Sequence, residues 1–115
     1  MNEMIIYLIL GIIIFIIYKK YTQYKVLKLV PSLLEEGGQI IDVRTKAEFT
    51  QGNKKGSINI PLDSLKTRIN ELDNSKPIII CCASGSRSAL AKRLLITKGF
   101  ENVHNVGMWK SLLKF

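Results

Sequence analysis

Cysteine and histidine are both scarce in this chain of 115 residues. Its only two cysteines, Cys81 and Cys82, are neighbours in the sequence, so they cannot cross-link distant segments. No C-x-x-C motif is present and His104 is the only histidine, which leaves too few ligands for a zinc site. We therefore expect no disulfide framework, no metal and no cofactor, and thiols that stay reduced, as in the cytosol.

Acidic residues are also few, nine against 17 Lys and Arg, for a net charge of +8. Four of the basic residues directly follow an apolar run: Lys19, Lys20, Lys25 and Lys28. Lysines in this position are typical of the cytoplasmic side of a membrane span, and they attract anionic lipid headgroups. The remaining lysines are scattered and not interleaved with aromatic residues, so we expect no nucleic-acid partner.

The apolar run itself, residues 4–18, lacks any charge or proline and reads MIIYLILGIIIFIIY. A signal peptide would carry positive charge before the run and small residues at a cleavage site after it, and neither is present. A buried core helix would be apolar all round, and the rest of this chain is too short to enclose one. We expect a single membrane span, with an interfacial anchor as the alternative.

A span over residues 4–18 would cover only roughly 22 Å of a hydrocarbon core about 30 Å thick. Tyrosines in the interface and snorkelling lysines can make up the difference. The expected organisation is an anchor with its basic flank over residues 1–24 and a domain over residues 25–115. The lysine bias places that domain in the cytoplasm, at the cell membrane.

From about residue 25 onward, short apolar runs alternate with helical patterns. A linker from residue 19 is expected to lead into a short helix over 31–36 that begins at Pro31. Strands are predicted at 39–43, 57–60, 78–82 and 102–106, and helical segments at 45–49, 63–72, 86–98 and 109–115. In the first of these helices, Thr45 and Glu48 have the spacing of a capping box. The helix over 86–98 would face inward through Ala89, Leu90, Leu94 and Leu95. This alternation predicts an α/β domain around a mainly parallel sheet.

Residues 78–88, IIICCASGSRS, are predicted to run from a buried central strand through a short loop into a helix. Ligands bind at such a place in open α/β sheets, because loop and helix N–H groups converge there and favour an anion. A thiol in this position has its thiolate stabilised and becomes a nucleophile. Counted from Cys81 the spacing is that of a cysteine phosphatase loop, and counted from Cys82 it is that of a sulfur-transfer loop.

The position of Gly85 decides which of the two cysteines is the predicted nucleophile. A loop that folds back over its own cysteine needs glycine where φ is positive. In the cysteine phosphatase pattern, C-x-x-G-x-x-R, this glycine stands three residues after the nucleophile. Counted from Cys82 that position is Gly85, whereas counted from Cys81 it is Ser84. Cys82 is therefore the predicted nucleophile, and Cys81 is interpreted as a small apolar residue of the strand.

The segment CASGSRSALAKRLLITKGFENVHNV resembles the active-site segment of the rhodanese (sulfurtransferase) family, C-x-x-G-x-R-S-x-x-A. Upstream, IDVRTKAEFTQGNKKGSINIPLDSL is similar to the family's D-V-R-x-x-x-E block and the G-x-x-x-G…P motif that follows it. The two matches cover about residues 38–107 in the right order. The resemblance implies a rhodanese-like three-layer α/β fold with a mainly parallel central sheet, here a single domain preceded by one transmembrane helix.

The resemblance also implies a sulfurtransferase in which Cys82 carries sulfur as a persulfide. The N–H groups of the loop that holds this sulfur would come from Ala83, Ser84, Gly85, Ser86 and Arg87. Arg87 would organise the loop or meet an anionic donor.

Three residues of the D-V-R…E block, Asp42, Arg44 and Glu48, would brace the loop. Partners would be a small anionic sulfur donor such as thiosulfate and a thiol or cyanide acceptor.

The chain departs from the family pattern at several positions, which are Asn53, Ala83, Met108 and Leu112. Ala83 replaces a basic residue, which puts thiosulfate in doubt as the preferred donor. Two alternatives therefore stay open: a membrane-tethered carrier that passes persulfide sulfur to a partner protein, and a phosphatase or arsenate-reductase-like enzyme that uses Cys81.

Overall fold

The computed structural model describes residues 2–115, so Met1, the first residue of the expected anchor, lies outside the described part. Four parallel strands form one sheet in the order β2-β1-β3-β4. Their bounds are β1 Gln39–Asp42, β2 Ile58–Asn59, β3 Ile78–Cys82 and β4 Val103–Met108. All four coincide with the predicted strands to within about two residues at each end, and β3 lies at the centre as expected.

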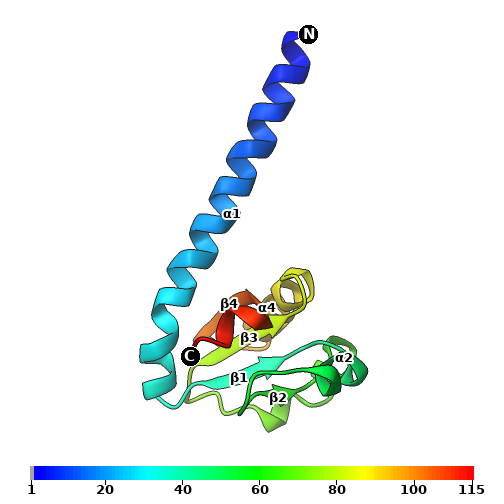
Figure 1. Cartoon of the computed structure of the whole chain (residues 1–115). Helices are drawn as coiled ribbons and strands as arrows, with labels where there is room; N and C mark the ends of the chain where they lie inside the picture. Colours follow the sequence, from blue (N-terminus) through cyan, green and yellow to red (C-terminus); the bar gives the residue numbers. More distant parts are fainter. Residues whose placement is uncertain (1) are drawn as a thin grey trace.

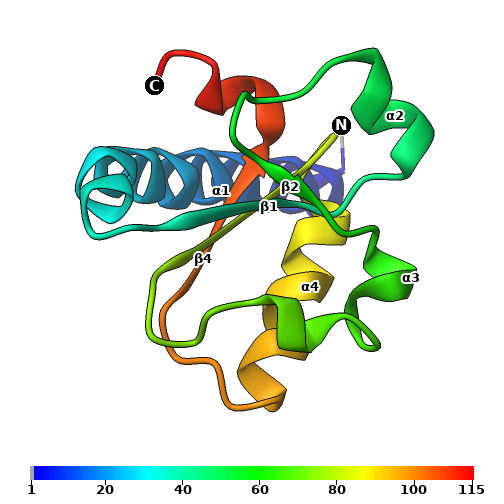
Figure 2. The same ribbon diagram turned by 90° about the horizontal axis from the view of Figure 1, so that it is seen from below.

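Helices cover both faces of the sheet, which confirms the three-layer rhodanese-like fold with a parallel central sheet (Figures 1 and 2). On one face lie α3, Leu62–Leu65, and α4, Ser86–Thr97, with the short helix η1, Ile69–Glu71. On the other face lie the second half of α1, Glu3–Glu35, and η2, Trp109–Leu112. The remaining helix, α2, Lys46–Gln51, follows β1 at the carboxyl edge of the sheet.

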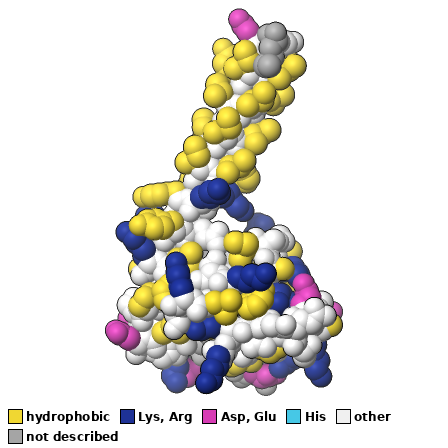
Figure 3. Space-filling model, viewed as in Figure 1, with side chains coloured by type: hydrophobic (Ala, Val, Ile, Leu, Met, Phe, Trp, Pro, Cys, Tyr) yellow, Lys and Arg dark blue, Asp and Glu magenta, His cyan; other side chains and the backbone are white. Residues whose placement is uncertain are grey.

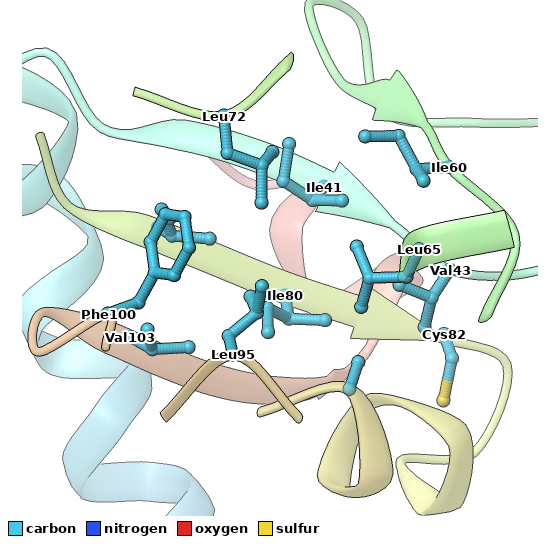
Figure 4. Close-up of a cluster of buried hydrophobic side chains, with 12 residues drawn as sticks. Ile41, Val43, Ile60, Leu65, Leu72, Ile80, Cys82, Leu95, Phe100 and Val103 are labelled. Carbon is cyan, nitrogen blue, oxygen red and sulfur yellow. The ribbon is translucent and has the colours of Figure 1, made fainter. Parts of the chain in front are cut away.

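The pleat of β3 divides the core into two clusters. All five residues of β3 are buried, and successive side chains point to opposite faces. Ile78, Ile80 and Cys82 join the cluster against α4, which Figure 4 shows with Leu95 beside Ile80. Ile79 and Cys81 join the cluster against α1. The side chains of the two cysteines therefore lie on opposite faces of the sheet.

The structure corrects the expected linker over residues 19–37. α1 is one continuous helix that runs through Pro31, and no short helix begins there. Val30 and Leu33, on either side of the proline, are buried against the sheet, whereas Pro31 itself is exposed. Packing of this apolar face compensates for the hydrogen bond that proline cannot donate, so the helix continues.

Two details of the helices on the α4 face also differ from prediction. The expected helix over 63–72 is broken into α3 and η1, because Leu72 has an extended conformation that places its side chain in the core, beside Ile41 in Figure 4. In α4, Leu90 is exposed rather than inward-facing, and the buried positions of the helix are Ser88, Ala91 and Leu95.

The first half of α1 projects away from the domain as a stalk, and the face seen in Figure 3 is almost entirely apolar. The large apolar side chains of residues 4–18 are all exposed. Among the described residues, α1 is the one helix that is long and apolar enough to cross a membrane. A core helix or an N-terminal signal sequence meets the same criterion of length and composition. None of the apolar window is buried in this structure.

Candidate active site

The loop between β3 and α4 lies at the carboxyl edge of the sheet, next to the start of η2. β3 ends at Cys82, and Gly85 precedes the first residue of α4. Gly85 has φ +105°, the left-handed conformation predicted for this position. A Cβ atom there would meet the Cα of Gly107 at 3.4 Å, an ordinary van der Waals contact, so the backbone conformation rather than lack of space favours glycine.

The sulfur of Cys82 accepts hydrogen bonds from two backbone N–H groups of the loop and the first turn of α4. The N–H of Gly85 donates to Sγ at 2.9 Å and the N–H of Ser88 at 3.4 Å. The Oγ of Ser88 lies 3.4 Å from Sγ and donates to the carbonyl of Gly85 at 3.0 Å, which holds the hydroxyl against the loop. This arrangement is suited to an anionic sulfur atom.

The pKa of the Cys82 thiol is shifted downward. Burial by itself raises this pKa, but the hydrogen bonds from the Ser88 side chain and from the N–H groups of Ser88, Gly85 and Ser84 outweigh burial. The pKa of Cys82 is therefore lower than the ordinary thiol value, which increases the thiolate fraction near neutral pH.

Cys81 has the opposite environment. It packs with Ile79 and Val106 against α1, on the face of the sheet away from α4. Burial, with a smaller contribution from the nearby carboxylate of Asp42, raises the pKa of the Cys81 thiol. The phosphatase alternative based on Cys81 conflicts with this geometry, because the loop N–H groups point at its neighbour.

Arg87 joins the loop to α2. Its guanidinium makes two hydrogen bonds to the carboxylate of Glu48, at 2.7 and 3.0 Å. Glu48 also completes a capping box with Thr45 at the start of α2, as the sequence predicted. The hydrogen bonds from Arg87, and then those from Thr45, lower the pKa of Glu48 to about 2. Both charges at this side of the loop are thus already paired.

Asp42 and Arg44 form a second, buried ion pair that does not touch the loop directly. Arg44 donates to both carboxylate oxygens of Asp42 and also to the carbonyl of Gly52 at 2.7 Å. Its guanidinium stacks on the ring of Trp109, 4.4 Å from the centroid. The pair therefore connects β1, the end of α2 and η2, three segments around the site.

The remaining predicted loop residues, Ala83, Ser84 and Ser86, are exposed at the mouth of the loop. Within residues 2–115, no group of His, Cys, Asp and Glu is arranged to hold a metal ion. Asn53 caps the end of α2 by donating to the carbonyl of Phe49.

The sequence analysis did not include Ser88 among the site residues. The signal was present, because the motif C-x-x-G-x-R-S contains this serine. Its side chain was not assigned a role because its orientation toward Sγ depends on how α4 docks on the sheet.

Comparison with known proteins places this geometry in a family. Residues 27–109 match the model of the rhodanese-like domain. The chain is 39% identical over 72 residues to the putative sulfur carrier protein YrkF of Bacillus subtilis, spanning 63% of this chain and only 39% of that protein. It is 35% identical over 74 residues to the thiosulfate sulfurtransferase PspE of Escherichia coli, spanning 63% of this chain and 71% of that protein.

A solved structure described as rhodanese with anions, from E. coli, superposes with a TM-score of 0.61 at 34% identity, covering 64% of this chain and 89% of the other. The family's homologues thus include both sulfurtransferases and sulfur carriers. With the family model covering most of its length, the chain belongs to the rhodanese-like domain family.

Proposed function

We propose that this protein transfers a sulfane sulfur from a small donor, such as thiosulfate or a persulfide, to a thiophilic acceptor through a persulfide on Cys82. The observation that carries the proposal is the pair of backbone N–H groups, from Gly85 and Ser88, that donate to Sγ. The same donors that favour the thiolate would also stabilise the negative charge of the persulfide.

In the first step the Cys82 thiolate attacks the sulfane sulfur of the donor. A bond forms between Sγ and that sulfur while the donor's sulfur–sulfur bond breaks, and the leaving group departs with the electron pair, as sulfite when the donor is thiosulfate. In the second step an acceptor thiolate or cyanide attacks the outer sulfur. The Cys82 thiolate is regenerated, and no outside oxidant or reductant is required.

The other site residues support this chemistry without taking part in it. Residues 83–87 shape the loop and supply N–H groups, with Arg87 held by Glu48 rather than free to meet a substrate. Asp42 and Arg44 support the segments around the loop. No general base is required, since the thiolate is already favoured.

A second candidate function is that of a sulfur carrier for a partner protein. Arg87 is the only cation in residues 82–87, and its charge is paired with Glu48. Residues 82–87 themselves therefore supply no unpaired charge for a small dianion such as thiosulfate, whereas a protein persulfide needs no such charge. The relative named a putative sulfur carrier agrees with this candidate.

The decisive experiment compares Cys82→Ser with Cys81→Ser in an assay with thiosulfate and cyanide. We expect the Cys82 variant to lose thiocyanate production completely and the Cys81 variant to retain most of it. Only the sulfur of Cys82 accepts the N–H hydrogen bonds, whereas Cys81 packs in the apolar cluster against α1. Activity that survives in Cys82→Ser and disappears in Cys81→Ser would refute the proposal.

Mass spectrometry of the protein after incubation with a donor separates the two candidates. Both require an added mass of about 32 Da on Cys82, since each passes through a persulfide at a nucleophilic thiol. A carrier would show the adduct with negligible thiocyanate production, and an enzyme would turn it over.

The proposal includes a membrane location. The apolar, exposed first half of α1 would span the cell membrane once, within an anchor and basic flank of residues 1–24. The lysines that follow it favour the cytoplasm for the domain of residues 25–115. A sulfur donor or acceptor protein would then meet the site close to the membrane.

A further inference from the structure

A cleft of about 380 Å³ opens where α1 meets the domain, beside the Cys82 loop. α1 forms one wall, α4 the opposite wall, and β4 with the loop the floor. We call it the junction cleft; the residues that matter here are Lys19, Gln23, Ser84, Gly85, Lys92 and Arg93. Cys82 itself is not among the residues that line the junction cleft.

The charge of the junction cleft is strongly one-sided. Lys19 comes from α1, and Lys92 and Arg93 come from α4, while no Asp or Glu in the described part of the chain lines the cleft. The ion pairs within residues 2–115 involve none of these three cations. A concave surface with several cations and no acidic neighbour favours a compact anion such as a phosphate group.

The position of the cleft along α1 points to a lipid headgroup as the source of such a phosphate group. Lys19 is the first residue after the apolar run, and its ammonium lies over the ring of Phe15, within the run, at 5.7 Å. From Lys19 to Gln23 the helix rises about 6 Å, and the headgroup layer on each side of a bilayer is about 5–7 Å thick. With the apolar run in the membrane, as in the proposed function, the junction cleft lies at the level of the lipid headgroups.

Direct contacts between α1 and the domain fix the position of the junction cleft relative to the apolar run. Gln23 Nε2 donates to the carbonyl of Val106 at 2.8 Å, and Gly107 leaves room for this approach. Further along, Val30 and Leu33 are buried in the core. Because α1 is continuous, the stalk cannot change its angle at a linker between membrane and domain. Figure 3 shows Lys and Arg side chains grouped where the apolar stalk reaches the domain.

From these observations we infer that the junction cleft binds the phosphate of an anionic phospholipid headgroup through Lys19, Lys92 and Arg93. A lipid in this position contacts the loop at Ser84 and Gly85. The bound lipid would therefore hold the Cys82 loop at the membrane surface. Sulfur donors and acceptors would then reach Cys82 at that surface. Lipid binding does not require the sulfur chemistry, because the proposed phosphate ligands Lys19, Lys92 and Arg93 line the cleft and Cys82 does not.

The test uses the full chain in neutral detergent micelles, titrated with phosphatidylglycerol or phosphatidylcholine and followed by amide chemical shifts. We expect saturable shifts at Gly85, Asn105 and Gly107 with phosphatidylglycerol, and binding at least about tenfold weaker with phosphatidylcholine. The double variant Lys92→Gln/Arg93→Gln should weaken phosphatidylglycerol binding about tenfold or more. The control Lys55→Gln/Lys66→Gln removes the same charge at exposed positions outside the cleft and should bind like the original chain.

Each other outcome overturns the inference. Equal binding of the two lipids would show that no anion site exists, and so would unchanged binding by the Lys92/Arg93 variant. Inorganic phosphate that produces the same shifts at the same concentration would identify a site for free anions instead. A Cys82→Ser chain should still bind phosphatidylglycerol, so failure of the sulfur chemistry and failure of the lipid site are distinguished.

Discussion

At the scale of single residues, Ser88 contributes most to the electrostatics of Cys82. Its hydroxyl and its N–H both lie 3.4 Å from Sγ. The hydroxyl accepts from the thiol and can turn to donate to the thiolate, and this hydrogen bond lowers the pKa of Cys82 more than that from the N–H. A Ser88→Ala variant keeps the N–H but loses the hydroxyl. We therefore expect the pKa of Cys82 to rise toward the ordinary thiol value in this variant.

The sign of the pH dependence follows from the reactive form. The thiolate attacks, so the rate falls as pH decreases through the pKa of Cys82, and Ser88→Ala should move this fall to higher pH. Alkylation of the thiol as a function of pH measures the shift directly. Ser86→Ala is the matched control, since its hydroxyl meets Ser84 rather than Sγ. An unchanged profile in Ser88→Ala would contradict the assignment.

At the scale of secondary structure elements, the pair of Glu48 and Arg87 ties α2 to the start of α4. Its contribution to stability depends on pH, because the pKa of Glu48 is about 2 in the folded chain against an ordinary value of 4.5. A lowered folded-state pKa means that the contribution is complete above about pH 4.5 and disappears as pH falls toward 2.

Glu48→Gln should therefore reduce the free energy of unfolding at neutral pH, and the difference from the original chain should shrink as pH falls from 4.5 to 2. Urea unfolding at several pH values measures it. Glu101→Gln, at an exposed position in the turn before β4, serves as the control. A difference independent of pH would contradict the assignment of this stability to the ionised Glu48 carboxylate.

The second half of α1 is a structural layer of the domain. Leu33 is only 7% exposed and packs in the core, whereas Leu29, one turn earlier, is 46% exposed. We expect Leu33→Ala to lower the free energy of unfolding by about 2–5 kcal/mol and Leu29→Ala to change it little. Chemical unfolding of both variants checks this contrast. Equal effects would show that α1 does not pack on the sheet as described.

At the scale of the whole molecule, the two halves of α1 differ in their surroundings: the first half is exposed and the second half packs on the sheet. Removing residues 2–18 deletes exposed apolar surface and leaves the buried half intact. The shortened chain should be soluble and folded, while the full chain should stay in the membrane pellet after washing at high pH. Extraction of the full chain by that wash would contradict the proposed span. Removing residues 2–35 instead should expose the core against α1 and prevent folding.

Much of this architecture follows from local sequence patterns. The four strands, the helix after the cysteines and the capping box at Thr45 were all predicted, because each depends on periodicity or on residues within one turn. The break between α3 and η1, the exposure of Leu90 and the path of α1 through Pro31 were not. Each depends on packing against residues distant in the sequence.

The sequence by itself determined that one of two adjacent thiols is followed by a loop with glycine at its turn, because positive φ is a local requirement of the backbone. Only the tertiary structure decided which donors surround that thiol. The docking of α4 on the sheet brings Ser88 to Sγ, and the docking of α1 on the other face encloses Cys81 and forms the junction cleft. Contacts of this kind join segments far apart in the chain, and no local pattern encodes their geometry.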